Sequence, residues 1–323
     1  MAIYQAFGAT IASNVRLPDL PVIAPRVADY FFYQQPSSYP SSETYDWFHQ
    51  WTLEDGTSWA LLAKYPSGTL IRFPGYADFH VVNGGSEIRC IPNPGIPQET
   101  TIHLFLDQVF PCLLSGGNQL LLHAASVAVD SNAVVFIGDT GSGKSTLTSS
   151  FGRAGFKLLT DDGLLVVEEA GYFWGVPSYP SLRLWPESLP ELFAQQPIST
   201  AVAHYSAKQR ISAGQAAVSF ASERIPLHSV YLLRPQPNKV AAPISITAVS
   251  PGQAFSKCFN SIFRLDVKNH SQLTDQFKMT ARLIETTPVF AINFPHDFSL
   301  LSSVRACILD HLSQNKNGRL LHQ

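Results

Sequence analysis

The sequence predicts an α/β protein in two parts: a small β-rich domain over residues 1–100 and an α/β domain over residues 101–323. In the first part, short apolar and aromatic runs are separated by turn residues, which is typical of strands. In the second part, strand-like and helix-like runs alternate, and a glycine-rich stretch follows an apolar strand. The 323 residues suffice for about two domains at roughly 100–200 residues each.

The first part is expected to form short antiparallel strands. Pairs such as Pro74-Gly75 separate the apolar runs, because these residues favour tight turns. A loop is expected over residues 34–42, which hold two prolines, and a linker over residues 92–97, which hold three. The expected strands cover residues 30–33, 59–62, 69–73 and 79–82.

The second part begins with a helix within residues 100–114, closed by a turn at residues 115–118. Residues 198–217 are poor in apolar runs, so a partly mobile loop is expected there. Strands are expected at residues 120–122, 126–129, 133–137, 156–159, 164–167, 230–233, 244–249 and 289–294. Helices are expected at residues 144–154, 252–263, 270–285 and 300–312.

Charge and hydropathy speak against several classes of function. The 22 Lys and Arg against 24 Asp and Glu leave a net charge of −2, so no nucleic-acid partner is expected. No apolar run approaches the roughly 20 residues of a membrane helix, so no membrane partner is expected either. The N-terminus lacks the pattern of a signal peptide, and the four scattered cysteines fit a reducing compartment, which together indicate a cytoplasmic location. The low charged fraction of 14 % leaves self-association into a homo-oligomer open.

The strongest motif runs from Gly138 to Ser145 and fits the pattern G-x-x-x-x-G-K-[ST]. Its glycines let successive backbone N–H groups face one concavity that binds phosphate oxygens, and the following helix adds its positive N-terminal end. We therefore expect a nucleotide site, with Lys144 on the terminal phosphates and Ser145 on Mg²⁺. The expected binding residues are Gly138, Asp139, Thr140, Gly141, Ser142, Gly143, Lys144, Ser145 and Thr146.

Two adjacent carboxylates, Asp161 and Asp162, stand at the end of the next expected strand. Beside a bound nucleotide, one carboxylate can hold Mg²⁺ and the other can accept a proton from an attacking hydroxyl. The alternative is an ordinary Asp-Asp-Gly turn between two strands, which is a common arrangement. Next to a phosphate loop, we favour the catalytic interpretation.

These residues resemble the HPr kinase/phosphorylase family, and more closely its shorter kinase relatives. The likeness joins the strand LHAASVAV at residues 122–129, the loop GDTGSGKST, and the strand GFKLLTDD at residues 155–162. It covers about 50 residues strongly, and it implies a P-loop kinase-like core of the HPr kinase/PEP carboxykinase type with a mixed sheet. Residues 1–100 resemble the small β-rich domain of HPr-kinase-like proteins, some of which phosphorylate a peptide hydroxyl in natural-product pathways.

The resemblance also implies roles for single residues. It makes Asp161 the base on the acceptor hydroxyl and Asp162 a metal-site carboxylate with Ser145, and it places His123 near the phosphates. By residue type alone, a core histidine at a strand end is the favoured interpretation of His123, and the resemblance reverses this preference. ATP with Mg²⁺ is the implied donor. Because Thr146 stands where the bifunctional enzymes carry an acidic residue, phosphorylase activity and HPr itself as substrate are not expected.

Further candidates have weaker support. Arg183 lies in an apolar stretch, where it would stabilise the transferring phosphoryl group or hold the acceptor, or else pack its stem on Trp185. The resemblance supports a site role, because the similar stretch of the kinase-like relatives also carries Arg. Lys208 and Arg210 are expected in a loop that closes over the phosphates, or else on a solvated surface. Three aromatic residues of the first part are expected in its core rather than in an acceptor groove: Trp47, Trp51 and Trp59.

Together these patterns predict an ATP-dependent P-loop phosphotransferase that phosphorylates a hydroxyl, first of all a serine of a peptide or protein. A small-molecule hydroxyl kinase would use the same machinery. A non-catalytic nucleotide switch would need no base, so the aspartate pair weighs against it. A phosphoenolpyruvate-carboxykinase-like reaction is disfavoured, because no residues are found for its carboxylate substrate.

Overall fold

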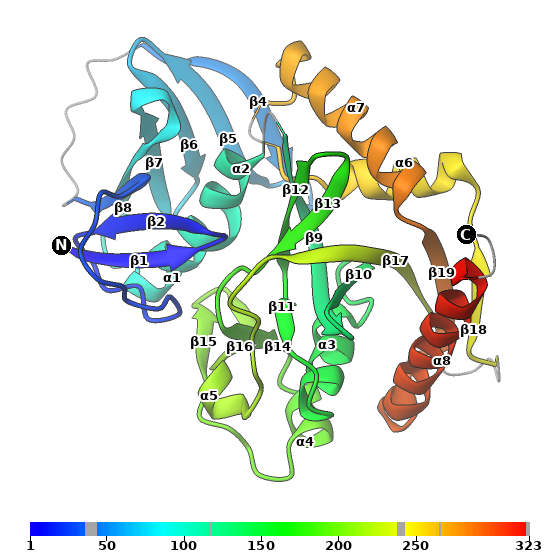
Figure 1. The fold of residues 1–323 in the computed structure, drawn as a ribbon. Helices are drawn as coiled ribbons and strands as arrows, with labels where there is room; N and C mark the ends of the chain where they lie inside the picture. The colour runs from blue at the N-terminus through cyan, green and yellow to red at the C-terminus, as the bar shows by residue number, and fades with distance from the viewer. Residues whose placement is uncertain (36–43, 116–117, 238–242, 265, 321–323) are drawn as a thin grey trace.

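The computed structural model describes residues 1–35, 44–115, 118–237, 243–264 and 266–320. It is a mixed α/β structure with two large sheets, a small three-stranded sheet, and helices gathered mainly around the second sheet (Figure 1). The α/β class is therefore confirmed, while the division into two domains at residue 100 stays a prediction. Most of the loop expected at residues 34–42 and half of the turn expected at 115–118 lie outside the described residues.

The first sheet has eight strands in the order β1-β2-β3-β8-β7-β6-β5-β4. They are β1 (Ala2–Ala6), β2 (Ala9–Ser13), β3 (Tyr30–Gln34), β4 (Asp46–Thr52), β5 (Ser58–Tyr65), β6 (Gly68–Phe73), β7 (Ala77–Val82) and β8 (Glu87–Pro92), with a 3-10 turn η1 (Asn83–Gly85) before β8. Most neighbours are antiparallel as expected, but β3 runs parallel to both β2 and β8. The long connection over residues 14–29 makes this possible, because parallel neighbours need a crossover.

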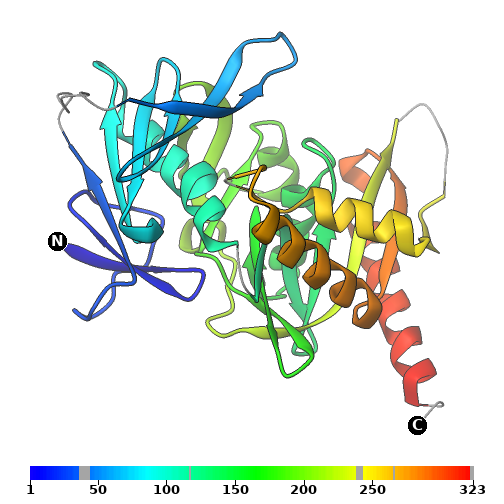
Figure 2. The ribbon, with the colours of Figure 1, turned by 90° about the horizontal axis from the view of Figure 1, so that it is seen from above.

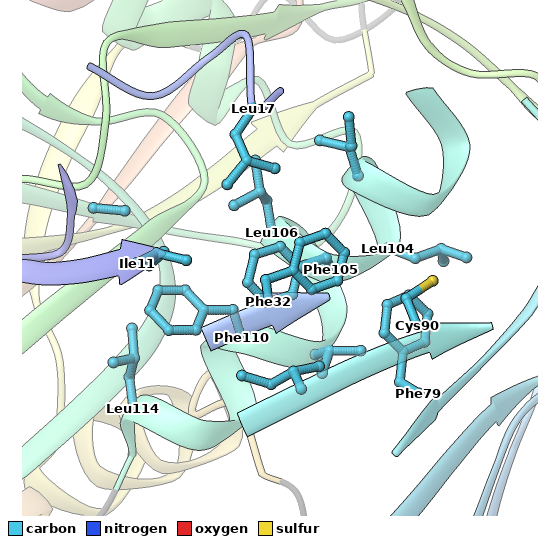
Figure 3. Packing of buried hydrophobic residues seen from close by; sticks show 14 of the residues in the cluster. Ile11, Leu17, Phe32, Phe79, Cys90, Leu104, Phe105, Leu106, Phe110 and Leu114 are labelled. Carbon is cyan, nitrogen blue, oxygen red and sulfur yellow. The ribbon is translucent and has the colours of Figure 1, made fainter. Parts of the chain in front are cut away.

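A helical segment that begins at Gln98 packs on this sheet. It consists of α1 (Gln98–Leu104), the π-helical turn η2 (Phe105–Val109) and α2 (Phe110–Leu114), which confirms the helix expected there. Phe105 stacks on Phe32 of β3 with ring centroids 3.9 Å apart, and Phe110 lies against Phe105 at 5.5 Å (Figure 3). The segment therefore buries its apolar side chains in the same core as the first sheet.

The second sheet is built around two long strands, β9 (Gln119–Val129) and β17 (Ile225–Gln236). Between them lies β10 (Asn132–Ile137), which is antiparallel to β9 and parallel to β17. The sheet also holds β11 (Leu158–Thr160), β12 (Gly163–Glu169), β13 (Tyr172–Val176), β18 (Ser245–Ala248) and β19 (Val289–Pro295). The sequence predicted two strands where β9 is continuous. Residues 123–125, which the prediction left between the two strands, continue the pairing: His123 pairs with β12, and Ala124 and Ala125 pair with β10.

Alternate residues of these strands face two separate cores. Val134 and Phe136 pack with α3 (Lys144–Arg153) and α8 (Leu301–Leu320), whereas Val135 packs with α6 (Pro251–Asn260) and α7 (His270–Thr286). Figure 2 shows α6 and α7 lying side by side and α8 running beyond the sheet towards the C-terminus. The four helices predicted here are thus present, with a 3-10 turn η3 (Phe298–Leu300) before α8.

The prediction of a mobile loop over residues 198–217 is wrong. This stretch forms β15 (Thr200–Ala203), β16 (Ser206–Ser212) and α5 (Ala213–Ala216), and with β14 (Ser181–Leu184) the strands make the third sheet. Polar residues conceal the pattern, because Arg210 of β16 is buried against Asp19 instead of an apolar partner. A short helix α4 (Ser188–Leu192) follows β14.

Among the helices that the structure describes, none is both long and apolar enough to cross a membrane.

Candidate active site

The glycine-rich loop connects the end of β10 at Ile137 to the start of α3 at Lys144. Gly141 and Gly143 have φ values of 81° and 90°, which L side chains rarely adopt. A Cβ at Gly138 would come within 2.4 Å of Ser142 Oγ, so this position also requires glycine. No side chain caps the N-terminus of α3, so its first N–H groups are free to bind an anion.

Lys144 is buried and folds back over the loop. Its Nζ donates to the carbonyl of Gly138 at 2.7 Å and to that of Asp139 at 3.3 Å. Burial lowers the pKa of Lys144, and the nearby carboxylate of Asp162 acts against this shift. Both hydrogen bonds end on neutral carbonyls, so an anion entering the loop would give this ammonium a better partner.

A cavity of about 590 Å³ opens over the loop and is lined by residues 140–147. Since β10 lies between β9 and β17 in the sheet, the loop separates two groups of lining residues. On the β9 side they include Gln108, His123, Asp162, Arg183 and Lys208. On the side of β17 and β19 they include Phe294, His296, Phe298 and Leu301. The cavity therefore has room on both sides of a phosphate group held in the loop.

The two aspartates differ sharply in access to this cavity. Asp161 is buried, and its Oδ2 accepts a hydrogen bond from the backbone N–H of Arg183 at 2.7 Å. Its Oδ1 is buried with no well-aligned hydrogen bond among the described residues. Burial and the charge of Asp162 raise the pKa of Asp161 to about 6, while the nearby hydroxyl of Ser145 acts to lower it.

Asp162 lines the cavity and lies between His123 and Arg183. Its Oδ1 is 3.2 Å from His123 Nδ1, and its Oδ2 is 3.6 Å from Arg183 Nη1. Burial acts to raise the pKa of Asp162, but the neighbouring His123 ring and the Arg183 guanidinium outweigh it and the pKa is lowered. Asp162 is therefore ionised at neutral pH and can reach a molecule in the cavity.

His123 stands on β9 at the point where the strand leaves β12 and begins to pair with β10. Its ring faces Asp162 on one side and the ring of Phe263 at 5.8 Å on another. Asp162 acts to raise the pKa of His123, but burial and the charges of Lys144 and Lys208 outweigh it, so the pKa is lowered. A largely neutral imidazole at neutral pH follows, able to donate one hydrogen bond and accept another.

Arg183 belongs to a group of buried ionic and polar side chains that we call the ionic network. Its members are Asp19, His103, Asp107, Tyr179, Arg183 and Arg210. The guanidinium of Arg183 contacts Asp107 and the hydroxyl of Tyr179, which itself donates to Asp107 at 2.9 Å. Beside it on the paired strand, Arg210 Nε is 3.0 Å from Asp19 Oδ2.

Two cations of this region lie over aromatic rings. The guanidinium of Arg183 lies over the ring of Tyr179, 5.5 Å from its centroid. The ammonium of Lys208 lies over the ring of Trp185, 5.5 Å from its centroid, and Lys208 lines the cavity. Lys208 and Arg210 are both on strand β16, so their expected place in a mobile loop is wrong.

The structure therefore brings most of the predicted site residues into one cavity and leaves others at its margin. Asp139 is exposed, and its carboxylate is 3.8 Å from Lys257 Nζ. Thr146 lines the cavity, with its hydroxyl 3.4 Å from that of Ser188. The backbone carbonyl of Gly138 serves the loop by holding Lys144.

Sequence reasoning missed Asp107 and its partners. Asp107 is an acid inside the apolar run of residues 104–110, four positions after His103 and in contact with it. A charge at such a position is almost never left unpaired in a protein interior. This rule could have marked Asp107 as part of a buried ion pair, although it does not identify the residue that pairs with it.

Within the described part of the chain, no three His, Cys, Asp or Glu side chains cluster as a metal site. A P-loop site does not need such a cluster, because Mg²⁺ there takes one or two protein oxygens together with phosphate oxygens and water.

Comparisons with known proteins give a distant likeness among solved structures. No family profile matches the chain, and no curated protein matches it. Among solved structures, the chain is similar to the Hpr(Ser) kinase/phosphatase from Coxiella burnetii, with a TM-score of 0.32 and 13 % identity over 61 % of this chain and 98 % of that one.

Proposed function

We propose that this protein is an ATP-dependent kinase that transfers the γ-phosphate to a hydroxyl. The acceptor that we favour is a serine of a peptide or protein. The observation that carries the proposal is the single cavity that joins an uncapped, glycine-rich helix N-terminus to Lys144, Asp162 and Arg183. Phosphoryl transfer depends on positioning and on charge stabilisation, and these groups supply both. The resemblance of the sequence to HPr-kinase-like proteins points the same way.

The loop would hold the donor phosphates through its backbone N–H groups. Lys144 would leave the carbonyls of Gly138 and Asp139 and bind the terminal phosphate oxygens instead. Arg183 is held by Asp107 and lines the cavity, so its guanidinium would stabilise negative charge that develops there without needing to reorganise. His123 lies beside Asp162 and would orient that carboxylate or donate a hydrogen bond to a phosphate oxygen.

The residues present fit Mg²⁺. Asp161 offers a buried carboxylate oxygen without a hydrogen-bond partner, next to the hydroxyl of Ser145 at the start of α3. Hard carboxylate and hydroxyl oxygens are the ligands that Mg²⁺ prefers. Bound there, Mg²⁺ would neutralise charge on the donor phosphates.

The geometry favours dividing the work of the aspartates differently from the family pattern. A general base must first lie within hydrogen-bond reach of the proton that it takes, and only then does its pKa matter. Asp162 faces the cavity, whereas Asp161 is enclosed between Ser145 and the backbone of Arg183. We therefore propose Asp162 as the group that accepts the hydroxyl proton and Asp161, with Ser145, as the metal-side carboxylate.

A phosphate-transfer assay tests the proposal. The purified protein, Mg²⁺ and γ-labelled ATP would be mixed with serine peptides and, separately, with small hydroxyl compounds. We expect label on a peptide, and label only on a small molecule would assign the protein to the alternative acceptor class. Nucleotide binding without transfer to any acceptor would favour a nucleotide switch instead.

Asn variants of the two aspartates separate their roles. With Asp162→Asn, we expect the maximal rate to fall about 10²-fold or more with little change in the Mg²⁺ concentration required. With Asp161→Asn, we expect that Mg²⁺ concentration to rise. Asp275→Asn, on the exposed face of α7, serves as the matched control and should behave as the wild type. The reverse pattern would restore Asp161 as the base.

A further inference from the structure

A second cavity lies beside the first and has a different chemical character. Its volume is about 260 Å³, and it lies between strands β4 to β6 of the first sheet, the η2–α2 segment and residues 262–264. Its walls are mainly aromatic and aliphatic, with Trp51, Trp59, Phe73 and Phe263 among them. Concave, mostly apolar hollows with a few polar groups, placed where two parts of a protein meet, are the usual form of a ligand site.

Two residues connect this aromatic cavity to the cavity over the phosphate loop. Gln108 lines both of them. Phe263 lines the aromatic cavity, and its ring also contacts His123, which faces Asp162 in the other cavity. The separation is thus about the thickness of one side chain. Successive residues of an extended peptide are about 3.8 Å apart, so a residue near the reacting serine can reach the aromatic cavity.

The polar group at this cavity is a cation. Arg264 lines it and is half-buried; its Nε donates to Gln276 at 3.0 Å, and its guanidinium lies 4.2 Å from the ring centroid of Phe259. Over the ranges that the structure describes, no carboxylate lies within ion-pair distance of Arg264. A half-buried cation with only neutral partners is stabilised when an anion binds next to it.

From this arrangement we propose that the aromatic cavity selects the acceptor: it binds an apolar, preferably aromatic, side chain within two residues of the phosphorylated serine, and Arg264 binds an acidic group beside that side chain. This inference deepens the proposed function and rests on it. It also assigns a task to the first sheet, which would hold the acceptor while the phosphate loop holds the donor.

Peptide binding without transfer tests this selection. The probes are blocked alanine hexapeptides with one serine, the same peptides with Phe at each position within two residues of the serine, and versions with Glu or Gln beside the Phe. Isothermal titration gives their affinities for the wild type. We expect at least one Phe peptide to bind roughly ten-fold or more tightly than its alanine parent, and Glu to improve on Gln.

Matched variants locate the effect. Trp51→Ala should remove the gain from Phe, whereas Trp47→Ala, on the same strand but 44 % exposed, should keep it. Arg264→Gln should remove the preference for Glu over Gln, and Arg282→Gln, which breaks an exposed ion pair on α7, should not. Equal binding of Phe and alanine peptides, or a gain that survives Trp51→Ala, would overturn the inference. Displacement of a fluorescent ATP analogue by MgATP tests the donor site separately. Failure of nucleotide binding would count against the proposed function, whereas failure of peptide selection alone would count against this inference.

Discussion

The glycine-rich loop and part of the ionic network, His103, Asp107 and Arg183, line the same cavity, but the charged groups of the loop and of the network have opposite kinds of partner. Among the residues that the structure describes, Lys144 hydrogen-bonds to backbone carbonyls alone, and no side chain caps the N-terminus of α3. In the network, by contrast, Arg183 and Arg210 already face Asp107 and Asp19. The loop thus has an ammonium and N–H groups that an anion could pair with, whereas both guanidinium groups of the network already have a carboxylate as counter-charge.

Breaking the network should give the largest effect on stability. Asp107→Asn would leave Arg183 buried without its main counter-charge, which typically costs about 3–5 kcal/mol. Urea denaturation measures this as a lower midpoint. Asp78→Asn removes the partner of Arg72 at the partly exposed surface of the first sheet, so it should cost about 1 kcal/mol or less. Equal costs for the two variants would show that the network is no more demanding than a surface pair.

Breaking the loop should affect transfer and not stability. Lys144→Met removes the ammonium that would bind the donor phosphates, and we expect transfer to fall about 10²–10³-fold. The free energy of unfolding should change little, because the lysine bonds only to two carbonyls of its own loop. Lys257→Met, which faces the exposed Asp139 on the outside of the loop, is the control and should retain the wild-type rate. A Lys144 variant that keeps most of its transfer rate would contradict the role given to the loop.

The smallest effect concerns Asp161, which lies between the two regions. Its pKa is raised from 3.8 to about 6, so between about pH 4 and 6 the folded protein binds a proton that the unfolded chain releases. The contribution of Asp161 to the stability of the wild type therefore falls as the pH rises through this window, by up to about 3 kcal/mol. Asp161→Asn cannot ionise and can still accept the N–H of Arg183, so most of this fall should disappear.

Denaturation at pH 4.5 and pH 8, in buffer with a chelator and no Mg²⁺, measures the difference. Asp275→Asn should show the pH dependence of the wild type. An unchanged pH dependence in Asp161→Asn would mean that its carboxylate is not the group that burial destabilises.

The loop and the network also differ in how far the sequence predicts them. The strand, glycine-rich loop and helix around Lys144 are contiguous in the chain, and the backbone requirement at each glycine is local. Asp162 and His123 followed from residue type and family pattern, and the structure does bring them within 3.2 Å of each other. The partner of Arg183, in contrast, is Asp107, which is distant in sequence and reaches it only through tertiary packing.

Local sequence patterns also failed to predict a strand whose buried side chain forms an ion pair. The strand β16 was not predicted, because Arg210 occupies a buried position that an apolar residue would normally mark. The same exchange of an apolar partner for an ionic one concealed Asp19, which lies in the connection between β2 and β3. Hydrophobic periodicity predicts elements that bury apolar side chains, whereas this part of the interior buries ion pairs.

The π-helical turn η2 determines in which direction the side chains that follow it in the helical segment project from the helix axis. Such a turn holds one more residue than an α-helical turn, and each residue of an α-helix advances the chain by about 100°. This extra residue lets Phe105 and Phe110 both enter the core of the first sheet while Asp107, between them, meets Arg183. The loss of a single residue here would keep the helix but turn Phe110 and α2 out of phase with Asp107. In this segment, sequence length is therefore as constrained as sequence identity.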